Sequence, residues 1–243
     1  MLLGDLLLSQ SPHKELVGQI WREREKTERE AASLFKHLGQ GMRECGLPED
    51  LVAMAEDASE DEIDHASRCR EIIAECEFNE PLLEAKPRGL LGPKNLPLAK
   101  RVLYTSAAMG CVTETMSTAL LLEMKKRMDA PVIEKTVRAI LGDEVNHSRL
   151  GWTHLAYYTQ TAEADYLGEY LPRMFESLLI AESEESSEKR PEHCDVYGLG
   201  VLPRLTVERV FKQTLEEVIM PGFEEFGVPM QLSHAWCRTR FST

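Results

Sequence analysis

The sequence lacks clusters of basic residues and long uninterrupted apolar runs. Its 28 Lys and Arg are outnumbered by 41 Asp and Glu, which gives a net charge of -13. A chain this acidic is repelled by phosphate backbones and anionic lipids, so we expect neither nucleic acid nor a membrane as a partner. The apolar stretch from Met1 to Leu8 is broken by Asp5 and is too short to span a bilayer. We expect a tail or the start of a packed helix there.

Paired cysteines are also absent. The six cysteines form no CxxC pair, and rubredoxin-type and zinc-ribbon sites need such pairs. Several of the cysteines lie in helical patterns, which favours reduced thiols over a disulfide framework and predicts a cytoplasmic protein. Any electrons for redox chemistry would therefore come from an external electron donor.

Four long segments carry apolar residues at alternating steps of three and four, the pattern of helices that bury one stripe. The first covers roughly residues 12–44, and the others begin at Pro48, Pro97 and Pro131. Proline is favoured in the first turn of a helix, so each proline marks a predicted helix start.

The connections between these segments define the expected topology. Only a few residues separate the first segment from the second and the third from the fourth, so each pair is predicted to be an antiparallel hairpin. Between the hairpins, Phe78 to Pro97 is rich in proline and reaches about 65 Å when extended, longer than a helix of about 30 residues. We expect an all-α, four-helix bundle over about residues 12–161, with a long crossover between its second and third helices. C-terminal helices and a tail over about 162–243 complete a single domain, 1–243.

The last third of the chain predicts two additional helices. One lies near Ala164 to Glu182, with a kink at Pro172, and the other near Pro203 to Ile219. The Pro221-Gly222 pair is expected to end or kink the second of them. These helices would cover one mouth of the bundle.

A glutamate interrupts each of the four buried stripes near its middle. Two of these glutamates are followed three residues later by a histidine on the same helical face. An unpaired carboxylate in a core is very costly, so four that face one another need cations or protons between them. The predicted metal ligands are Glu28, Glu62, His65, Glu114, Glu144 and His147.

The positions of these residues along their helices favour one shared site. In both hairpins the ligands lie about 20 Å from the connecting turn, level to within about one helical turn. Four carboxylates and two imidazoles suit two divalent ions of the iron or manganese class better than a tetrahedral zinc. Glu28 is preferred to Glu25 and Glu30 because it keeps heptad step with Trp21 and Phe35. A metal-free polar network is the alternative, and it would need several shared protons near neutrality.

This pattern resembles the ferritin-like diiron-carboxylate superfamily, which includes rubrerythrins, ribonucleotide reductase small subunits and diiron oxygenases. The family order of Glu, ExxH, crossover, Glu and ExxH matches the chain from about Lys14 to Tyr158. The resemblance implies a ferritin-like fold and two Fe ions, with a Mn/Fe pair as the alternative. It also implies that Asp61 and Asp143, which precede the two ExxH motifs, hydrogen-bond ligand histidines. Two exposed acids are the competing interpretation.

Other residues on the inner stripes are candidates for a substrate or dioxygen pocket. Cys69 and Cys111 each lie one turn from a predicted ligand, although small cysteines are also ordinary core residues. His154 lies two turns beyond His147, and we expect a hydrogen-bonded core or lid histidine there rather than an extra ligand. Small residues near the ligands either leave a cavity or allow close helix approach; they are Ala31, Ala58, Ala66, Ala107, Gly110, Ser117 and Gly151.

Three functions are compatible with such a centre. We expect a non-haem diiron oxygenase or oxidase that activates dioxygen to oxidise a small organic substrate, because the two additional helices suit a substrate pocket. A ferroxidase or iron-handling ferritin-like protein is one alternative, and a rubrerythrin-like peroxide reductase is another. The identity of the substrate and the oligomeric state, including a homodimer, stay open.

Overall fold

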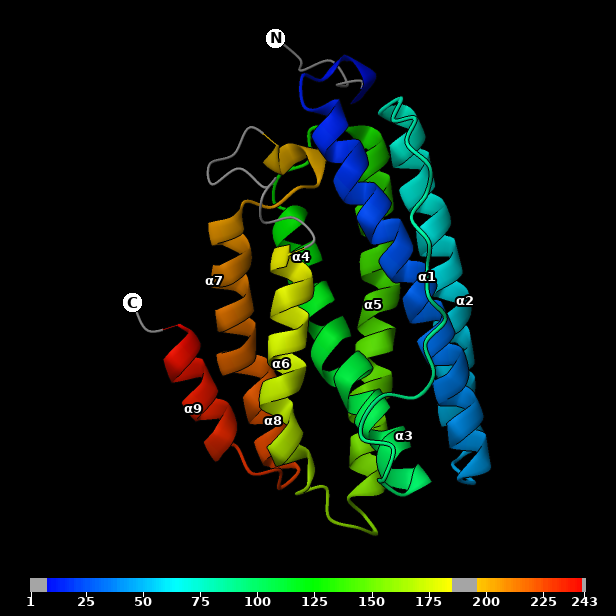
Figure 1. Ribbon diagram of the computed structural model, residues 1–243, viewed down its shortest axis with the longest axis vertical. Helices are drawn as coiled ribbons and strands as arrows, with labels where there is room; N and C mark the ends of the chain where they lie inside the picture. Colours follow the sequence, from blue (N-terminus) through cyan, green and yellow to red (C-terminus); the bar gives the residue numbers. More distant parts are fainter. Residues whose placement is uncertain (1–7, 185–195, 242–243) are drawn as a thin grey trace.

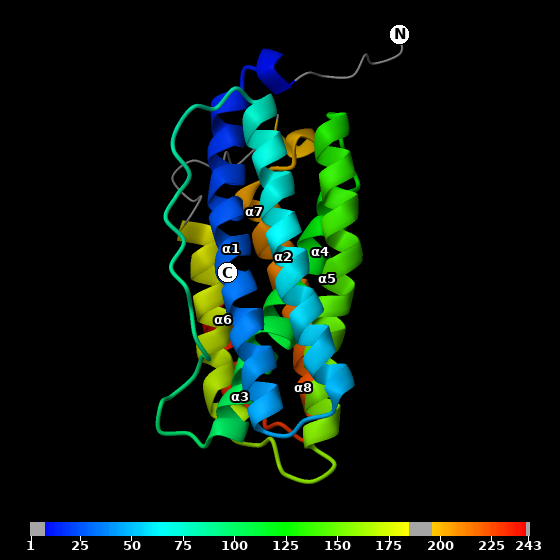
Figure 2. The same cartoon turned by 90° about the vertical axis from the view of Figure 1, so that its right-hand side faces the viewer.

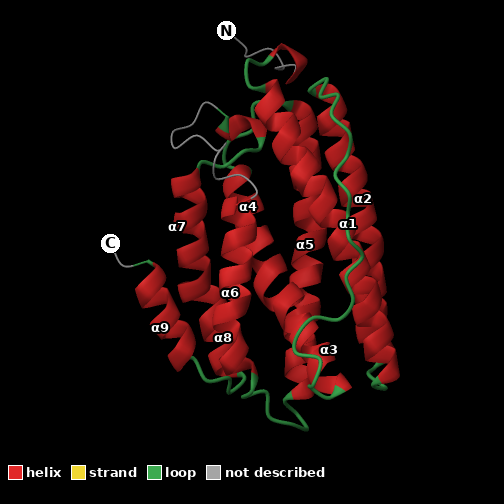
Figure 3. Cartoon of the chain, viewed as in Figure 1, coloured by secondary structure: helices red, strands yellow, loops and turns green. Residues whose placement is uncertain are grey.

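All regular structure in the described part of the chain is helical. The computed structural model describes residues 8–184 and 196–241, and every regular element in these ranges is a helix (Figure 3). The expectation of an all-helical fold is therefore confirmed for these residues. Within them, no helix is long and apolar enough to cross a membrane. Most of the apolar start of the chain, for which we expect a tail or the start of a packed helix, lies outside the described residues.

The first two long helices form an antiparallel hairpin. Helix α1 (Lys14–Glu44) and helix α2 (Glu49–Glu75) are joined by a tight turn. Gly46 adopts a φ of 69° in this turn, and the Leu47 N–H donates to Met42 O at 3.1 Å. Glycine adopts this left-handed conformation at little cost because it has no Cβ. The glycine therefore ends α1 and starts the reversal into α2.

An extended crossover, residues 76–97, runs along α1 and leads to the third long helix (Figure 2). Side chains of α1 bind its backbone at successive positions. Arg29 Nη2 donates to Leu83 O at 2.6 Å, and the Lys86 N–H donates to Glu30 Oε1 at 3.1 Å. Backbone groups outside a helix need such partners where water is excluded. The crossover thus returns the chain to the end of the molecule at which α2 began.

The third long helix changes its winding near the middle of the molecule. Helix α3 (Leu98–Ser106) continues through a π-helical segment, η2 (Ala107–Glu114), into helix α4 (Thr115–Met124). The apolar pattern after Pro97 predicts a helix here, but it does not predict the wider π turn. Such segments are rare and often occur at functional sites. Glu114 is the last residue of this one.

Helix α5 (Pro131–Tyr158) completes a set of four long helical rods. It packs against α2 on one side and against η2 and α4 on the other, while α1 contacts both α2 and α3. In Figure 2, α1, α2 and α5 stand side by side. The hairpin and the crossover make α1 and α5 run in one direction and the other two rods in the opposite direction (Figure 1).

The C-terminal helices lie along the side of this bundle. Helix α6 (Leu167–Glu184) contacts η2, and helix α7 (Arg204–Thr214) contacts α4 (Figure 1). The expectation that these helices cover one mouth of the bundle is therefore corrected, because they form a second layer along its length. The physical reason is lateral packing: Phe175 and Phe211 belong to the same buried hydrophobic cluster as Trp21 of α1.

Two further details of the C-terminal third differ from the sequence expectations. Of the two outcomes expected at Pro221-Gly222, an end or a kink, the end does not occur, because the π-helical segment η4 (Leu215–Ile219) leads directly into helix α8 (Met220–Glu225). Local π winding rearranges the hydrogen bonds that a proline would otherwise break. Helix α9 (Gln231–Arg240) was not predicted, because it buries few of its side chains and carries no clear apolar stripe.

The backbones of α5 and η2 touch where two glycines face each other. A Cβ added to Gly151 would lie 2.5 Å from Cys111 N, and one added to Gly110 would lie 2.6 Å from Gly151 Cα. No side chain fits at either position without a shift of the backbone. Close helix approach, one of the two roles expected for the small residues, is therefore the role of these two.

This contact predicts different effects for two glycines of the same helix. The Gly151→Ala variant should lower the free energy of unfolding by about 2 kcal/mol, because the added methyl group overpacks a backbone contact. Gly142 is exposed on α5 with nothing within 4 Å of an added Cβ. The Gly142→Ala control should be neutral or stabilising by up to about 1 kcal/mol. Urea denaturation followed by circular dichroism measures both, and equal stabilities would contradict the contact.

Candidate metal centre

The six predicted ligands meet in the interior of the four long helices. All are buried, from His65 at 0% to Glu28 at 7% exposed. They form two groups whose candidate ligand atoms lie within 4.8 Å of one another: Glu28, Glu62, His65 and Glu144 in one, and Glu62, Glu114, Glu144 and His147 in the other. Glu62 and Glu144 belong to both groups, so these two carboxylates lie between the two histidines. A buried cluster of this composition could hold metal ions.

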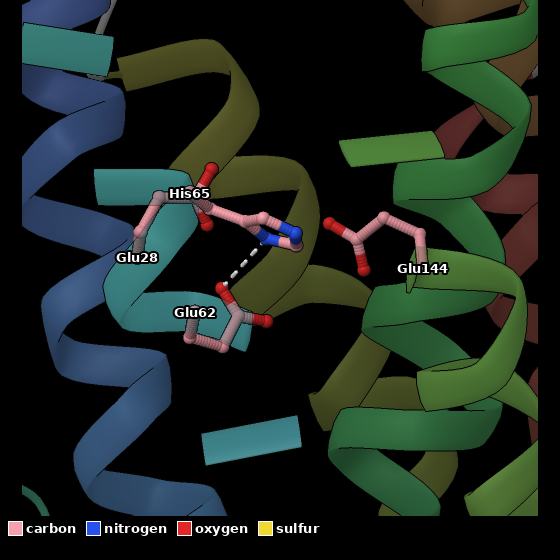
Figure 4. A group of neighbouring side chains, drawn as sticks. All are labelled: Glu28, Glu62, His65 and Glu144. Atoms are coloured by element: carbon pink, nitrogen blue, oxygen red, sulfur yellow. Dashed lines mark ion pairs between the residues drawn. The ribbon is translucent and has the colours of Figure 1, made fainter. Parts of the chain in front are cut away.

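Helical spacing explains how each ExxH motif presents two groups together. Glu62 and His65 are three residues apart on α2, and Glu62 Oε2 lies 3.4 Å from His65 Nδ1. Figure 4 shows Glu144 reaching from α5 towards this pair. On α5, Glu144 Oε2 lies 3.3 Å from His147 Nδ1, which is also 3.2 Å from Glu62 Oε1. Both histidines therefore turn Nδ1 towards the shared carboxylates.

The outer nitrogen of each histidine contacts an aspartate of the other helix. His65 Nε2 lies 3.2 Å from Asp143 Oδ2, and His147 Nε2 lies 3.2 Å from Asp61 Oδ2. A histidine that donates from Nε2 to a carboxylate keeps the lone pair of Nδ1 free for a metal ion. The resemblance implies such contacts for Asp61 and Asp143. Each aspartate contacts the histidine of the other helix. This pairing depends on how α2 and α5 pack, which the sequence does not reveal.

The neighbours of Glu28 on α1 have partners elsewhere. Glu25 accepts from Arg70 Nη2 at 2.7 Å, and Glu30 Oε2 lies 2.7 Å from Arg88 Nη2 of the crossover. Both of these glutamates are buried, but each neutralises its charge against an arginine. Glu28 is the residue of this segment that joins a candidate ligand group. The three glutamates therefore lie in different environments, and the one in the cluster is Glu28, which the heptad spacing with Trp21 and Phe35 favours.

Several buried atoms of the cluster have no hydrogen-bond partner. Both carboxylate oxygens of Glu62, one oxygen each of Glu114 and Glu144, and Nδ1 of both histidines lack one among the described residues. The close approaches between these atoms do not have hydrogen-bond geometry. Buried polar atoms without partners are rare because each costs desolvation free energy. Divalent cations would satisfy all of them at once, so this donor set fits metal ions.

Without cations, protons would have to balance the buried charge. Burial raises the pKa of Glu28 and of Glu114 well above the usual range, and the neighbouring carboxylates raise both further. Burial also raises the pKa of Glu62, but the adjacent His147 and His65 outweigh this effect and hold it at about 2. Burial lowers the pKa of His147, yet the contacts with Glu144 and Glu62 raise it to about 11. These shifts favour the protonated forms of Glu28, Glu114 and His147 when no metal is bound, and metal ions would displace those protons.

A cavity of about 670 Å³ adjoins the cluster. The carboxylates of Glu28, Glu62, Glu114 and Glu144 form part of its wall, whereas the two histidines do not line it. The rest of the wall comes from α1, the crossover, α3, η2, α4, α6, the segment 200–202 and α7. Ala31 and Ser117 also line the cavity. Some of the small residues therefore line a cavity, whereas Gly110 and Gly151 allow close helix approach.

The residues predicted as pocket candidates lie elsewhere. Cys69 and Cys111 are fully buried in the hydrophobic core, and His154 is 1% exposed. None of the three is among the residues that line the cavity. Burial lowers the pKa of His154 to about 4, and its Nδ1 has no hydrogen-bond partner among the described residues.

Two side-chain contacts of the carboxylates were not predicted from the sequence. Ser117 Oγ donates to Glu144 Oε1 at 3.1 Å. Arg24 Nε lies 3.6 Å from Glu28 Oε1, and its guanidinium stacks on the Trp21 ring at 5.2 Å from the centroid. Arg24 precedes Glu28 by one helical turn, so an i,i+4 rule could have found that contact. The Ser117 contact joins two helices and carries no local signal.

The chain was compared with protein-family models, curated proteins and solved structures, and none of these comparisons found a match. The described residues establish a helical protein with a buried carboxylate and histidine cluster compatible with metal ions.

The aspartate contacts predict a selective effect on metal binding. The Asp143→Asn and Asp61→Asn variants should bind Mn(II) about ten- to a hundredfold more weakly, because the partner histidine loses its orienting carboxylate. Asp64 is the matched control, since it lies in the same motif but pairs with Arg68 at 2.6 Å on the surface. Calorimetric titration should give the Asp64→Asn variant the wild-type affinity. Equal affinities in all three variants would contradict the orienting role.

Proposed function

We propose that the chain is a ferritin-like diiron protein that acts as a non-haem oxygenase or oxidase on a small organic substrate. One observation carries the proposal: two overlapping ligand groups share Glu62 and Glu144 and open onto a cavity of about 670 Å³. A carboxylate-rich set with two histidines on four helices is the arrangement that ferritin-like dimetal proteins use.

Each group has the composition of one iron site. Glu28 and His65 would complete the site on one side, and Glu114 and His147 the site on the other, with Glu62 and Glu144 shared between them. Mixed carboxylate and imidazole donors suit iron or manganese, whereas structural zinc sites are closed and tetrahedral. When bound, a pair of ferrous ions supplies two electrons for the reduction of dioxygen. Because the chain contains no CxxC pair, an external electron donor would restore the reduced state.

Other residues would orient the metal ligands and exclude water from the cavity. Asp61 and Asp143 hold the two imidazoles in the tautomer that directs Nδ1 inwards. Met116 and Leu120, which are 0% and 3% exposed, contribute apolar wall next to Glu114. A cavity of this size lies within the range of about 300 to 1,000 Å³ that small-molecule sites occupy. A site that only oxidised and passed on iron would not need such a space, and this favours an organic substrate over ferroxidase activity.

Iron loading under argon followed by exposure to dioxygen tests this proposal. The wild-type chain should retain two Fe(II) per chain, consume dioxygen repeatedly with ascorbate present, and keep the same two ions afterwards. The Glu144→Gln variant should consume dioxygen at least about tenfold more slowly, because a shared carboxylate is lost. Glu60 is exposed on α2, so Glu60→Gln is the matched control and should behave like the wild type.

Other outcomes would assign the protein to a different class. Continued oxidation of added Fe(II) with accumulation of stored ferric iron would indicate a ferroxidase. Faster consumption of hydrogen peroxide than of dioxygen would indicate a peroxide reductase. Retention of fewer than about one ion per chain would contradict the diiron proposal altogether.

A further inference from the structure

Among the described residues, one arginine of the cavity beside the metal cluster has no acidic partner. Three arginines line this cavity. Arg24 lies beside Glu28, and Arg88 pairs with Glu30 at 2.7 Å. Arg173, exposed on α6, has no ion pair or hydrogen bond with the rest of the described chain. In a protein with a net charge of -13, a free guanidinium at the opening of a cavity is available to an anionic ligand.

The neighbourhood of Arg173 is a firm part of the wall. Tyr104 is 7% exposed and lines the same cavity. Its ring contacts Tyr170 of α6 edge-on, with centroids 5.5 Å apart, and a Cβ added to Gly92 of the crossover would lie 2.9 Å from its Cγ. Burial raises the pKa of Tyr104, and the nearby positive charge of Arg173 opposes this rise. The crossover, α3 and α6 thus fix the rim on which Arg173 sits.

Apolar side chains form much of the rest of the wall, and the other two arginines already pair with glutamates. Met116 and Leu120 of α4 and Leu178 of α6 lie on its walls. At the metal end, two divalent ions would be balanced by four carboxylates, so the loaded cluster would offer no net charge to an anion. A ligand with one anionic end would therefore place that end at Arg173 and its apolar part towards the cluster. A single guanidinium matches a monoanion, and its planar fork matches a carboxylate.

From these features we propose that the cavity binds apolar monocarboxylic acids, with the carboxylate on Arg173 and the hydrocarbon part directed towards the metal cluster. The proposal rests on the proposed function for the reaction that follows binding, since it names the substrate class of that centre. Binding itself requires only the cavity and Arg173. It can therefore be measured on the chain without iron.

Calorimetric titration with straight-chain carboxylates from hexanoate to dodecanoate, and with the matching primary alcohols, tests the proposal. At least one carboxylate of the series should bind the metal-free wild-type chain about tenfold or more tightly than its alcohol, because a charge-assisted hydrogen bond is lost in the alcohol. The Arg173→Gln variant should bind that carboxylate about tenfold more weakly and the alcohol unchanged. Arg149 is also exposed but does not line the cavity, so Arg149→Gln should match the wild type. Circular dichroism of each variant checks that it is folded.

Several results would overturn the proposal. These are equal affinities for carboxylate and alcohol, no binding of any carboxylate, or the same loss in the Arg173→Gln and Arg149→Gln variants. Mn(II) binding is measured on the same preparations. If the wild type binds two Mn(II) but does not prefer carboxylates, this proposal fails and the metal centre stands. If it binds no Mn(II), the proposed function fails, while the preference of the metal-free chain still decides this proposal.

Discussion

Four carboxylates that face one another inside a helical bundle are the constraint on which the rest of the structure depends. Glu62 and Glu144 are only 1% and 2% exposed, and charge buried in this way is very costly unless cations or protons balance it. The surroundings reflect this cost. Histidines contact the shared carboxylates, half-buried aspartates contact the histidines, and the neighbouring acids Glu25 and Glu30 are neutralised by arginines.

Much of the four-rod arrangement could be predicted from local sequence. Gly46 ends α1, Pro131 starts α5, and the proline-rich stretch between the hairpins can only be an extended crossover. The winding of η2 could not be predicted, because an apolar stripe looks the same in α- and π-helical turns over a few residues. The lateral position of α6 and α7 depends on which faces of the bundle stay uncovered, and this is a tertiary property.

The candidate site was predictable to the extent that one helix determines it. The four glutamates and two histidines can be recognised in the sequence because each interrupts an otherwise apolar stripe. The close approach of Gly110 to Gly151 can be anticipated because both positions carry small residues. Contacts between helices were not visible. Three features depend on how two or more helices pack and so could not be predicted. They are the contact between Asp143 and His65, the hydrogen bond from Ser117 to Glu144, and the contribution of α6 to the cavity wall. For the same reason, the sequence could not show that Cys69 and Cys111 do not line this cavity.

The location of bound ions is the most direct test of a two-ion centre. Crystals of the Mn(II)-loaded chain, measured on both sides of the manganese absorption edge, would give an anomalous difference map. Two peaks are expected about 3.5 to 4 Å apart, one next to His65 and one next to His147, with Glu62 and Glu144 between them. A single peak at the cluster would contradict a dimetal centre, and peaks confined to the acidic surface with the cluster intact would favour a metal-free polar network.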